Sequence, residues 1–159
     1  MKKLKLFQAL LLSVFLCGSI SAQTKQKVNI ADQPGWGSVG YEYVEYYYLP
    51  DLETYYSVSK QKFIYLEKSR WVKNSILPLI FINYDIYSGR KVVLNEPKPY
   101  LKHEEFKVKY ISTYKRTGVK SIRDSHDPKY FINKNHPEHA NWLKDHNYKM
   151  PQLGQNTWN

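Results

Sequence analysis

The chain has 159 residues, a net charge of +10 at pH 7, a single cysteine and 15 tyrosines. Because that cysteine is Cys17, the chain beyond it cannot use a disulfide, a cysteine nucleophile or a thiolate metal site. Apart from one N-terminal run, no apolar segment reaches the ~20 residues that a membrane-spanning helix needs. We therefore expect no transmembrane segment once that run is removed.

The first 22 residues have the pattern of a secretory signal peptide. Three lysines precede an apolar run at 6–16, and small residues follow it up to Ala22. We expect cleavage of the type I signal peptidase kind after Ala22, which would lower the net charge by three, to +7. A lipoprotein signal is the alternative, because Cys17 ends the apolar run, but the large Leu16 before it disfavours a lipobox. The protein is thus expected to be exported to the periplasm or the cell surface.

Residues 23–40 are polar and then rich in glycine and proline, which predicts a flexible lead-in. Trp36 stands between two glycines in this segment and is able to dock on the domain that follows. Composition places that domain at 41–120, and a polar, loosely ordered tail at 121–159.

Four short segments rich in β-forming residues begin the domain. They are expected at 41–49, 53–58, 62–67 and 70–74, and short polar or proline-containing stretches separate them. Strands of this length, joined by turns of a few residues, indicate an antiparallel meander.

Apolar side chains occupy both faces of the first predicted strand. Alternation places Tyr47 and Leu49 on one side, and Val44, Tyr46 and Tyr48 on the other. A sheet that is apolar on both faces is usually covered on both. The cover must then come from the rest of the chain.

The tyrosines of this region have two interpretations. Tyrosine packs as a large apolar ring and keeps a hydroxyl for water or a partner, which suits a small core without disulfides. Alternatively, exposed rings form a stacking platform for a glycan, with Trp36, Tyr47, Tyr56 and Trp71 as the candidate ligand-contact aromatics. We favour the core interpretation.

The second half of the domain has a short helix or strand expected at 79–83, a strand at 91–94 and a helix from Pro99 to about Tyr114. One stripe at helical spacing is predicted to pack on the sheet, namely Tyr100, His103, Glu104, Lys107, Val108 and Ile111. The predicted class is therefore α+β: a small tyrosine-rich antiparallel β-meander packed with one main helix, followed by a polar C-terminal tail.

The tail contains a possible short helix and most of the histidines. His126, His136 and His139 are the candidates for a metal site, since imidazole is a common zinc ligand. Pro137 separates the last two, and no HExxH frame exists. We favour surface histidines and expect no metal and no other cofactor.

A catalytic site is not indicated by the remaining polar residues. Ser125 precedes His126 between two aspartates, but a catalytic triad requires the nucleophile and the base to meet in space beside an oxyanion hole. We expect a protein that is not an enzyme. The alternative is a small hydrolase or a metal-binding protein that uses the C-terminal histidines.

The order of motifs resembles that of small exported tyrosine-rich proteins of Bacteroidota-type bacteria that have no assigned function. The matching residues are Tyr46-Tyr47-Tyr48-Leu49-Pro50-Asp51, Tyr55-Tyr56, Phe63-Ile64-Tyr65, Trp71-Val72, Leu77-Pro78, Gly89-Arg90-Lys91-Val92-Val93, Pro99-Tyr100 and Lys107-Val108-Lys109-Tyr110. The match covers about half of the chain, from Tyr41 to Tyr114, and departs from the pattern at Leu49, where an aromatic residue is common. The resemblance implies a fold and an exported address, and it implies no catalytic residues.

Taken together, these observations predict an exported cell-envelope protein with a structural or binding role. Its basic charge would suit an acidic envelope glycan or an anionic lipid surface, and a glycan- or polyanion-binding module using exposed Tyr, Trp and Lys is the first alternative. Export argues against nucleic acid as the partner. Lysines that only solvate the surface would give the same charge.

Overall fold

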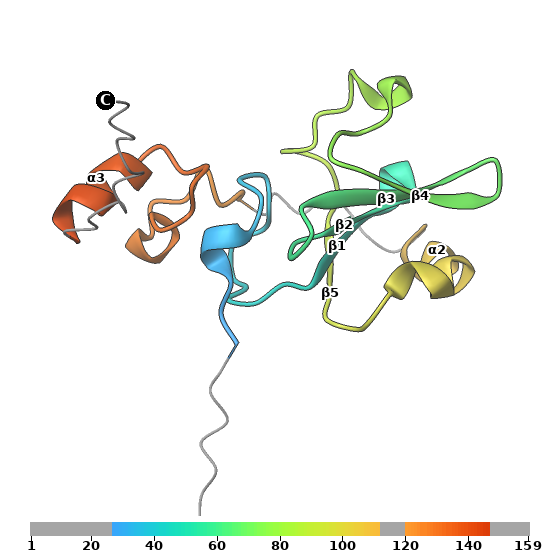
Figure 1. The fold of residues 1–159 in the computed structure, drawn as a ribbon, viewed down its shortest axis with the longest axis horizontal. Helices are drawn as coiled ribbons and strands as arrows, with labels where there is room; N and C mark the ends of the chain where they lie inside the picture. Colours follow the sequence, from blue (N-terminus) through green and yellow to red (C-terminus); the bar gives the residue numbers. More distant parts are fainter. Residues whose placement is uncertain (1–26, 112–119, 147–159) are drawn as a thin grey trace, which may run out of the picture.

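The computed structural model describes residues 27–111 and 120–146, and a five-stranded antiparallel sheet is its central element (Figure 1). The strand order is β4-β3-β2-β1-β5. One main helix packs with the sheet, and a second, short helix lies toward the C-terminal end (Figure 1). The predicted α+β class is confirmed. Among the described residues, no helix has both the length and the apolar character needed to cross a membrane.

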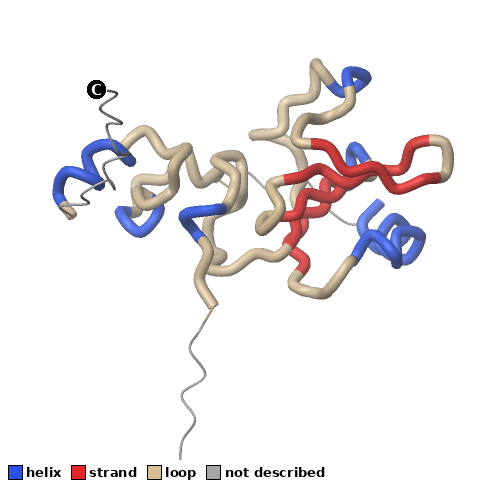
Figure 2. Tube along the Cα trace, viewed as in Figure 1, coloured by secondary structure: helices blue, strands red, loops and turns tan. Residues whose placement is uncertain are grey.

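The regular elements are short, and several are single turns of 3-10 helix (Figure 2). The strands are β1 (Tyr46–Leu49), β2 (Thr54–Ser57), β3 (Lys62–Glu67), β4 (Arg70–Asn74) and β5 (Val92–Leu94). The helical elements are η1 (Ile30–Asp32), η2 (Pro50–Leu52), η3 (Leu79–Phe81), η4 (Pro99–Lys102), α2 (His103–Ile111), η5 (Pro128–Tyr130) and α3 (His139–Asp145). The continuation of the main helix to Tyr114 was predicted for residues that lie outside the described ranges.

Strands β1 to β4 form the predicted meander, and β5 adds to its other side. Tyr47 in β1 therefore lies between Tyr56 of β2 and Val93 of β5. The β3–β4 turn has two residues, Lys68 and Ser69, with φ angles of 45° and 61°. Positive φ at both central positions is the requirement of the type I′ turn, which matches the twist of a hairpin.

One face of the sheet carries an aromatic and aliphatic core that the lead-in and the 77–86 segment cover. Its buried members are Val44, Tyr47, Leu49, Leu52, Tyr56, Val58 and Phe63. The Trp36 ring meets the rings of Tyr47 and Tyr56 edge-on, with centroids 5.3 Å and 5.1 Å apart. The predicted side of Val44 was wrong: it packs with Tyr47 rather than Tyr46, because β1 begins at Tyr46 and strict alternation does not extend to the residues before it.

The opposite face is covered by η4 and α2. Its buried members are Tyr46, Tyr48, Tyr55, Ile64, Leu94, Tyr100 and Phe106. The stripe predicted for the helix was partly wrong. Tyr100 and His103 are buried as expected, but Phe106 completes the packed side and Val108 is 73% exposed. The first turn is 3-10 rather than α, which changes the angle between successive side chains and shifts the packed side of the helix.

The chain after residue 120 packs against the lead-in and forms a third, smaller cluster. Ile30, Ile122 and Tyr130 are buried together. Ser38 forms a β-bridge with Ser121, and the N–H of Ile122 donates to the carbonyl of Gly37. The predicted short helix is present as α3. The described parts of the two segments, for which we predict a flexible lead-in and a loosely ordered tail, are joined by backbone hydrogen bonds.

Two buried amides connect this third cluster to the sheet. The Asn133 amide donates to the carbonyls of Ile30 and Gln33, at 2.7 Å each. Gln33 is fully buried, and its side-chain oxygen accepts from the Tyr47 hydroxyl at 2.8 Å. Tyr130 accepts from the N–H of Gly40. The lead-in is thus fixed between the sheet and the C-terminal segment.

We expect Tyr47→Ala to destabilise the protein by ~3–5 kcal/mol, the usual cost of truncating a buried aromatic ring. Tyr47→Phe keeps the ring but leaves the Gln33 oxygen without its donor, and should cost ~1–3 kcal/mol. Urea unfolding followed by circular dichroism measures both.

The matched control is Val108→Ala on the exposed side of α2, which should change the free energy of unfolding by less than ~0.5 kcal/mol. Equal stability of wild type and Tyr47→Ala would contradict the assignment of Tyr47 to the core.

Candidate functional site

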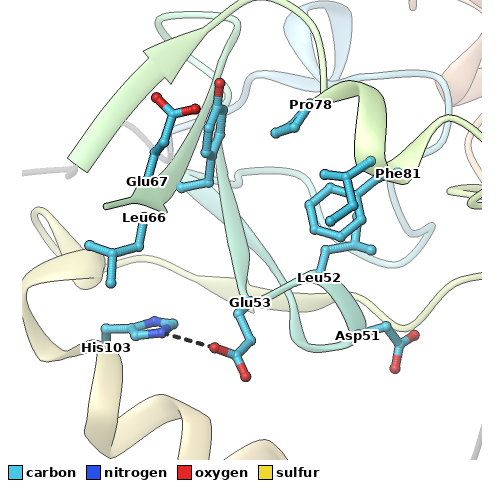
Figure 3. Close-up of a pocket in the computed structure, with 10 residues that line it drawn as sticks. Asp51, Leu52, Glu53, Leu66, Glu67, Pro78, Phe81 and His103 are labelled. Carbon is cyan, nitrogen blue, oxygen red and sulfur yellow. Dashed lines mark ion pairs between the residues drawn. The ribbon is translucent and has the colours of Figure 1, made fainter. Parts of the chain in front are cut away.

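A cleft of about 440 Å³ opens where β3 ends, beside η2, η3 and the first residue of α2 (Figure 3). Its lining combines carboxylates, a histidine and apolar side chains: Asp51, Leu52, Glu53, Tyr65, Leu66, Glu67, Pro78, Ile80, Phe81 and His103. Clefts with apolar walls and a few convergent polar groups are the usual form of ligand sites. We therefore treat this cleft as the candidate site.

Glu53 reaches the cleft from an unusual backbone conformation. It caps η2 with φ 48° and ψ 35°, in the left-handed region that favours glycine. Its N–H donates to the carbonyl of Pro50, and its side chain points toward α2. Strain of this kind persists where surrounding contacts hold it. Here those contacts are the ion pair with Lys107 at 2.9 Å and the approach of His103 at 3.5 Å.

His103 has partners on both ring nitrogens. Its Nε2 faces the Glu53 carboxylate, which only accepts hydrogen bonds, so Nε2 carries the proton. The Tyr55 hydroxyl then donates to Nδ1 at 3.2 Å. The Trp71 ring packs edge-on against the imidazole, and the histidine side chain is only 8% exposed. His103 therefore joins the sheet to α2 at the base of the cleft.

Opposite charges surround two of the three carboxylates. Hydrogen bonding from the Lys107 ammonium, with further help from its charge, lowers the pKa of Glu53. Burial alone would raise the pKa of Asp51, but hydrogen bonds from Arg90 and from the Tyr84 hydroxyl outweigh it and lower that pKa. The Arg90 guanidinium lies 2.6 Å from the Asp51 carboxylate. Both groups are thus held as anions at neutral pH.

Glu67 differs from the other two carboxylates. It is exposed at the end of β3, and in the described ranges it forms no ion pair. Figure 3 places Glu67 and Glu53 at opposite ends of the open space, with Leu66 on one side and Phe81 on the other. Among the described residues, Glu67 therefore gives the cleft a negative charge without a counter-ion beside apolar walls.

The four aromatic residues predicted as ligand contacts lie in different parts of the fold. Tyr47 is fully buried and Tyr56 is 9% exposed, so their rings belong to the core. Trp36 packs among them, half-buried, and Trp71 packs against His103 on the opposite face. The four rings therefore do not form one platform, and none of them lines this cleft.

The candidate metal-ligating histidines are held by other interactions. His136 is buried; its Nδ1 accepts from the N–H of Glu138, so its Nε2 must donate to the carbonyl of Ser125. His139 donates from Nδ1 to the carbonyl of Phe131. His126 is exposed beside a second pocket that His136 also lines. In the part of the chain that the structure describes, no group of three or more metal-ligating side chains converges.

Sequence reasoning missed the three residues that define the cleft, namely Glu53, Glu67 and Phe81. Glu53 follows η2, Glu67 ends β3 and Phe81 ends η3, so each comes from a different element of the chain. One local signal was present for Glu53. A turn that starts at Pro50 ends directly before the next strand, so the chain must reverse sharply at Glu53.

Comparison with protein-family models, with curated proteins and with solved structures gives no match to this chain. The cleft must therefore be interpreted from its own chemistry.

Glu53→Gln should make stability less dependent on pH. A lowered folded-state pKa means that the carboxylate stabilises the protein above its usual pKa of 4.5, and that this contribution is lost as the pH falls through the lower folded value. The wild type should therefore exceed the variant in free energy of unfolding at about pH 7, and the difference should shrink toward zero at about pH 3. Urea unfolding at both pH values measures it.

The matched control is Glu67→Gln, the same substitution in the same cleft at a carboxylate without an ion pair in the described ranges. It should change the free energy of unfolding little at either pH. A Glu53→Gln effect of equal size at both pH values would contradict the role given to the Lys107 ion pair.

Proposed function

We propose that this chain is an exported, non-catalytic binding protein of the bacterial cell envelope, and that its cleft holds a ligand with an apolar body and a cationic group. The observation that carries the proposal is the Glu67 carboxylate, which forms no ion pair with any described residue and lines the same cleft as Leu66 and Phe81. The resemblance to exported tyrosine-rich proteins accords with the address but names no ligand.

The charge pattern of the cleft supports a cationic ligand. Glu53 is 45% exposed and already partnered, whereas Glu67 has no such partner in the described ranges. An ammonium group near Glu67 would be attracted to the Glu67 carboxylate without displacing Lys107 from Glu53. The half-buried rings of Tyr65 and Phe81 offer surfaces on which an apolar body can pack and on which a cation is attracted to the ring face.

The arrangement of His103 supports a role other than catalysis. A general base must offer a free nitrogen to the substrate. Both nitrogens of His103 face internal partners, Tyr55 and Glu53, and the ring is nearly enclosed. In this position the contacts of His103 with Tyr55 and Glu53 fix the start of α2 beside the cleft.

A glycan- or polyanion-binding module is the second candidate, because of the net charge of +7 expected after cleavage. The placement of Tyr47 and Tyr56 in the core removes two of the four rings on which an aromatic platform would depend. Of the possible polyanions, an anionic lipid surface is the one that a feature of the fold supports. That feature is the exposed apolar segment at 75–83, which is separate from the aromatic rings.

A series of ligands that share a phenethyl body and differ in the terminal group tests the cleft. We expect phenethylammonium to bind more tightly than phenylethanol, and phenylpropionate to bind least, because only the first carries a positive charge toward Glu67. Isothermal titration or chemical-shift titration measures the three dissociation constants. Glu67→Gln should remove most of the preference for the ammonium ion, and Phe81→Ala should weaken all three ligands.

The matched control is Glu42→Gln, an exposed carboxylate outside the cleft, which should leave the three constants unchanged. Equal or tighter binding of the carboxylate ligand, or a preference for ammonium that persists in Glu67→Gln, would contradict the proposed ligand class.

Export is tested by the mass of the protein recovered outside the cytoplasm of an expression host. We expect a chain that begins at Gln23 and carries no lipid. A mass that matches an acylated Cys17 would contradict type I cleavage, and retention of the whole N-terminal segment in the cytoplasm would contradict export.

A further inference from the structure

Four aliphatic side chains project from one short segment of this protein, residues 75–83, which we call the apolar loop. Ile76, Leu79, Ile80 and Ile82 are 64%, 78%, 82% and 75% exposed. Single exposed aliphatics are common on protein surfaces, but four within seven residues concentrate exposed apolar surface on one short segment. Such patches mark sites of contact with another protein or with a membrane.

The backbone of the apolar loop is ordered, so these side chains are held outward. The N–H of Phe81 donates to the carbonyl of Pro78 at 2.9 Å, and the N–H of Ile82 donates to that of Leu79 at 3.0 Å. Leu77 and Phe81 turn inward and pack on the sheet core. The loop thus divides into an inner side that anchors it and an outer side that has no cover among the described residues.

The shape of the loop favours a flat, fluid partner. Figure 1 shows the segment around η3 projecting away from the sheet. A short projecting segment presents little surface to a second rigid surface. The acyl boundary of a bilayer accepts such side chains without shape complementarity.

The charge beside the loop favours an anionic surface. Between Glu67 and Asp85 the chain contains the basic residues Lys68, Arg70 and Lys73 and no acidic residue. Of the nearby acidic groups, Asp51 is paired with Arg90 and Glu53 with Lys107, and Glu67 and Asp85 form no ion pair in the described ranges. Basic residues next to an inserted apolar segment are attracted to anionic headgroups.

We propose that the apolar loop inserts into the headgroup and acyl boundary of an anionic bilayer, with Ile76, Leu79 and Ile82 in the lipid and the basic residues of β4 at the headgroups. This peripheral attachment does not depend on the cleft, since these three side chains are not among those that line it. It also differs from a membrane span, because the loop is too short to cross a bilayer.

A single fluorescent label tests insertion directly. The chain from Gln23 keeps every described residue and contains no cysteine, so Leu79→Cys provides one thiol for the fluorophore NBD. Vesicles of phosphatidylglycerol and phosphatidylcholine should shift its emission to the blue and raise its intensity. Vesicles of phosphatidylcholine alone should do so at least about tenfold more weakly, because the charge attraction is missing.

The matched control carries the label at Leu101→Cys, an aliphatic position of similar exposure in η4. It should show little change with the same vesicles. Co-sedimentation of the unlabelled double variant Leu79→Asn/Ile82→Asn should be at least about tenfold weaker than that of the wild type, and Leu101→Asn/Val108→Asn, which removes two exposed aliphatics elsewhere, should match the wild type.

Equal spectral change at positions 79 and 101 would overturn the proposal, since it would indicate non-specific adsorption. A blue shift at position 79 that appears without lipid and grows with protein concentration would also overturn it, in favour of self-association through the loop. Circular dichroism of each variant establishes that it is folded before either comparison.

Discussion

The sheet is apolar on both faces, and the arrangement of the other segments depends on the need to cover both of them. Tyr47 and Tyr48 are neighbours in β1, point in opposite directions and are both buried. Without disulfides, a five-stranded sheet of this size needs cover on each side to be stable. The lead-in and the 77–86 segment cover one face, and η4 with α2 covers the other.

The same constraint explains why segments of polar composition are ordered. The hydroxyl proton of Tyr47 would be buried without an acceptor if the Gln33 side-chain oxygen did not accept it. Gln33 is held in turn by Asn133, which lies 100 positions further along the chain. A series of polar contacts thus joins β1 to the lead-in and to the C-terminal segment. Burial makes each of its members costly to lose.

The cleft and the apolar loop share the segment around η3, which links the two proposals in space. Phe81 lines the cleft from the inner side of this segment, while Leu79 and Ile82 face outward. A ligand in the cleft would therefore lie next to a surface that we infer to be in contact with lipid. A ligand that reaches the cleft from the bilayer would have to partition into lipid. An amphiphilic cation has both the apolar body and the positive charge that this position requires.

The sequence by itself determined the class of fold and most of the strands, because alternating β-formers, prolines and short polar turns act locally. It placed Tyr47 on one face and Tyr48 on the other, and it anticipated a helix from Pro99. Only the tertiary structure decided which polar residues are buried, and it alone brought Glu53, Glu67 and Phe81 to one cleft. Such meetings depend on long-range packing and on a left-handed turn at Glu53, which no local pattern specifies.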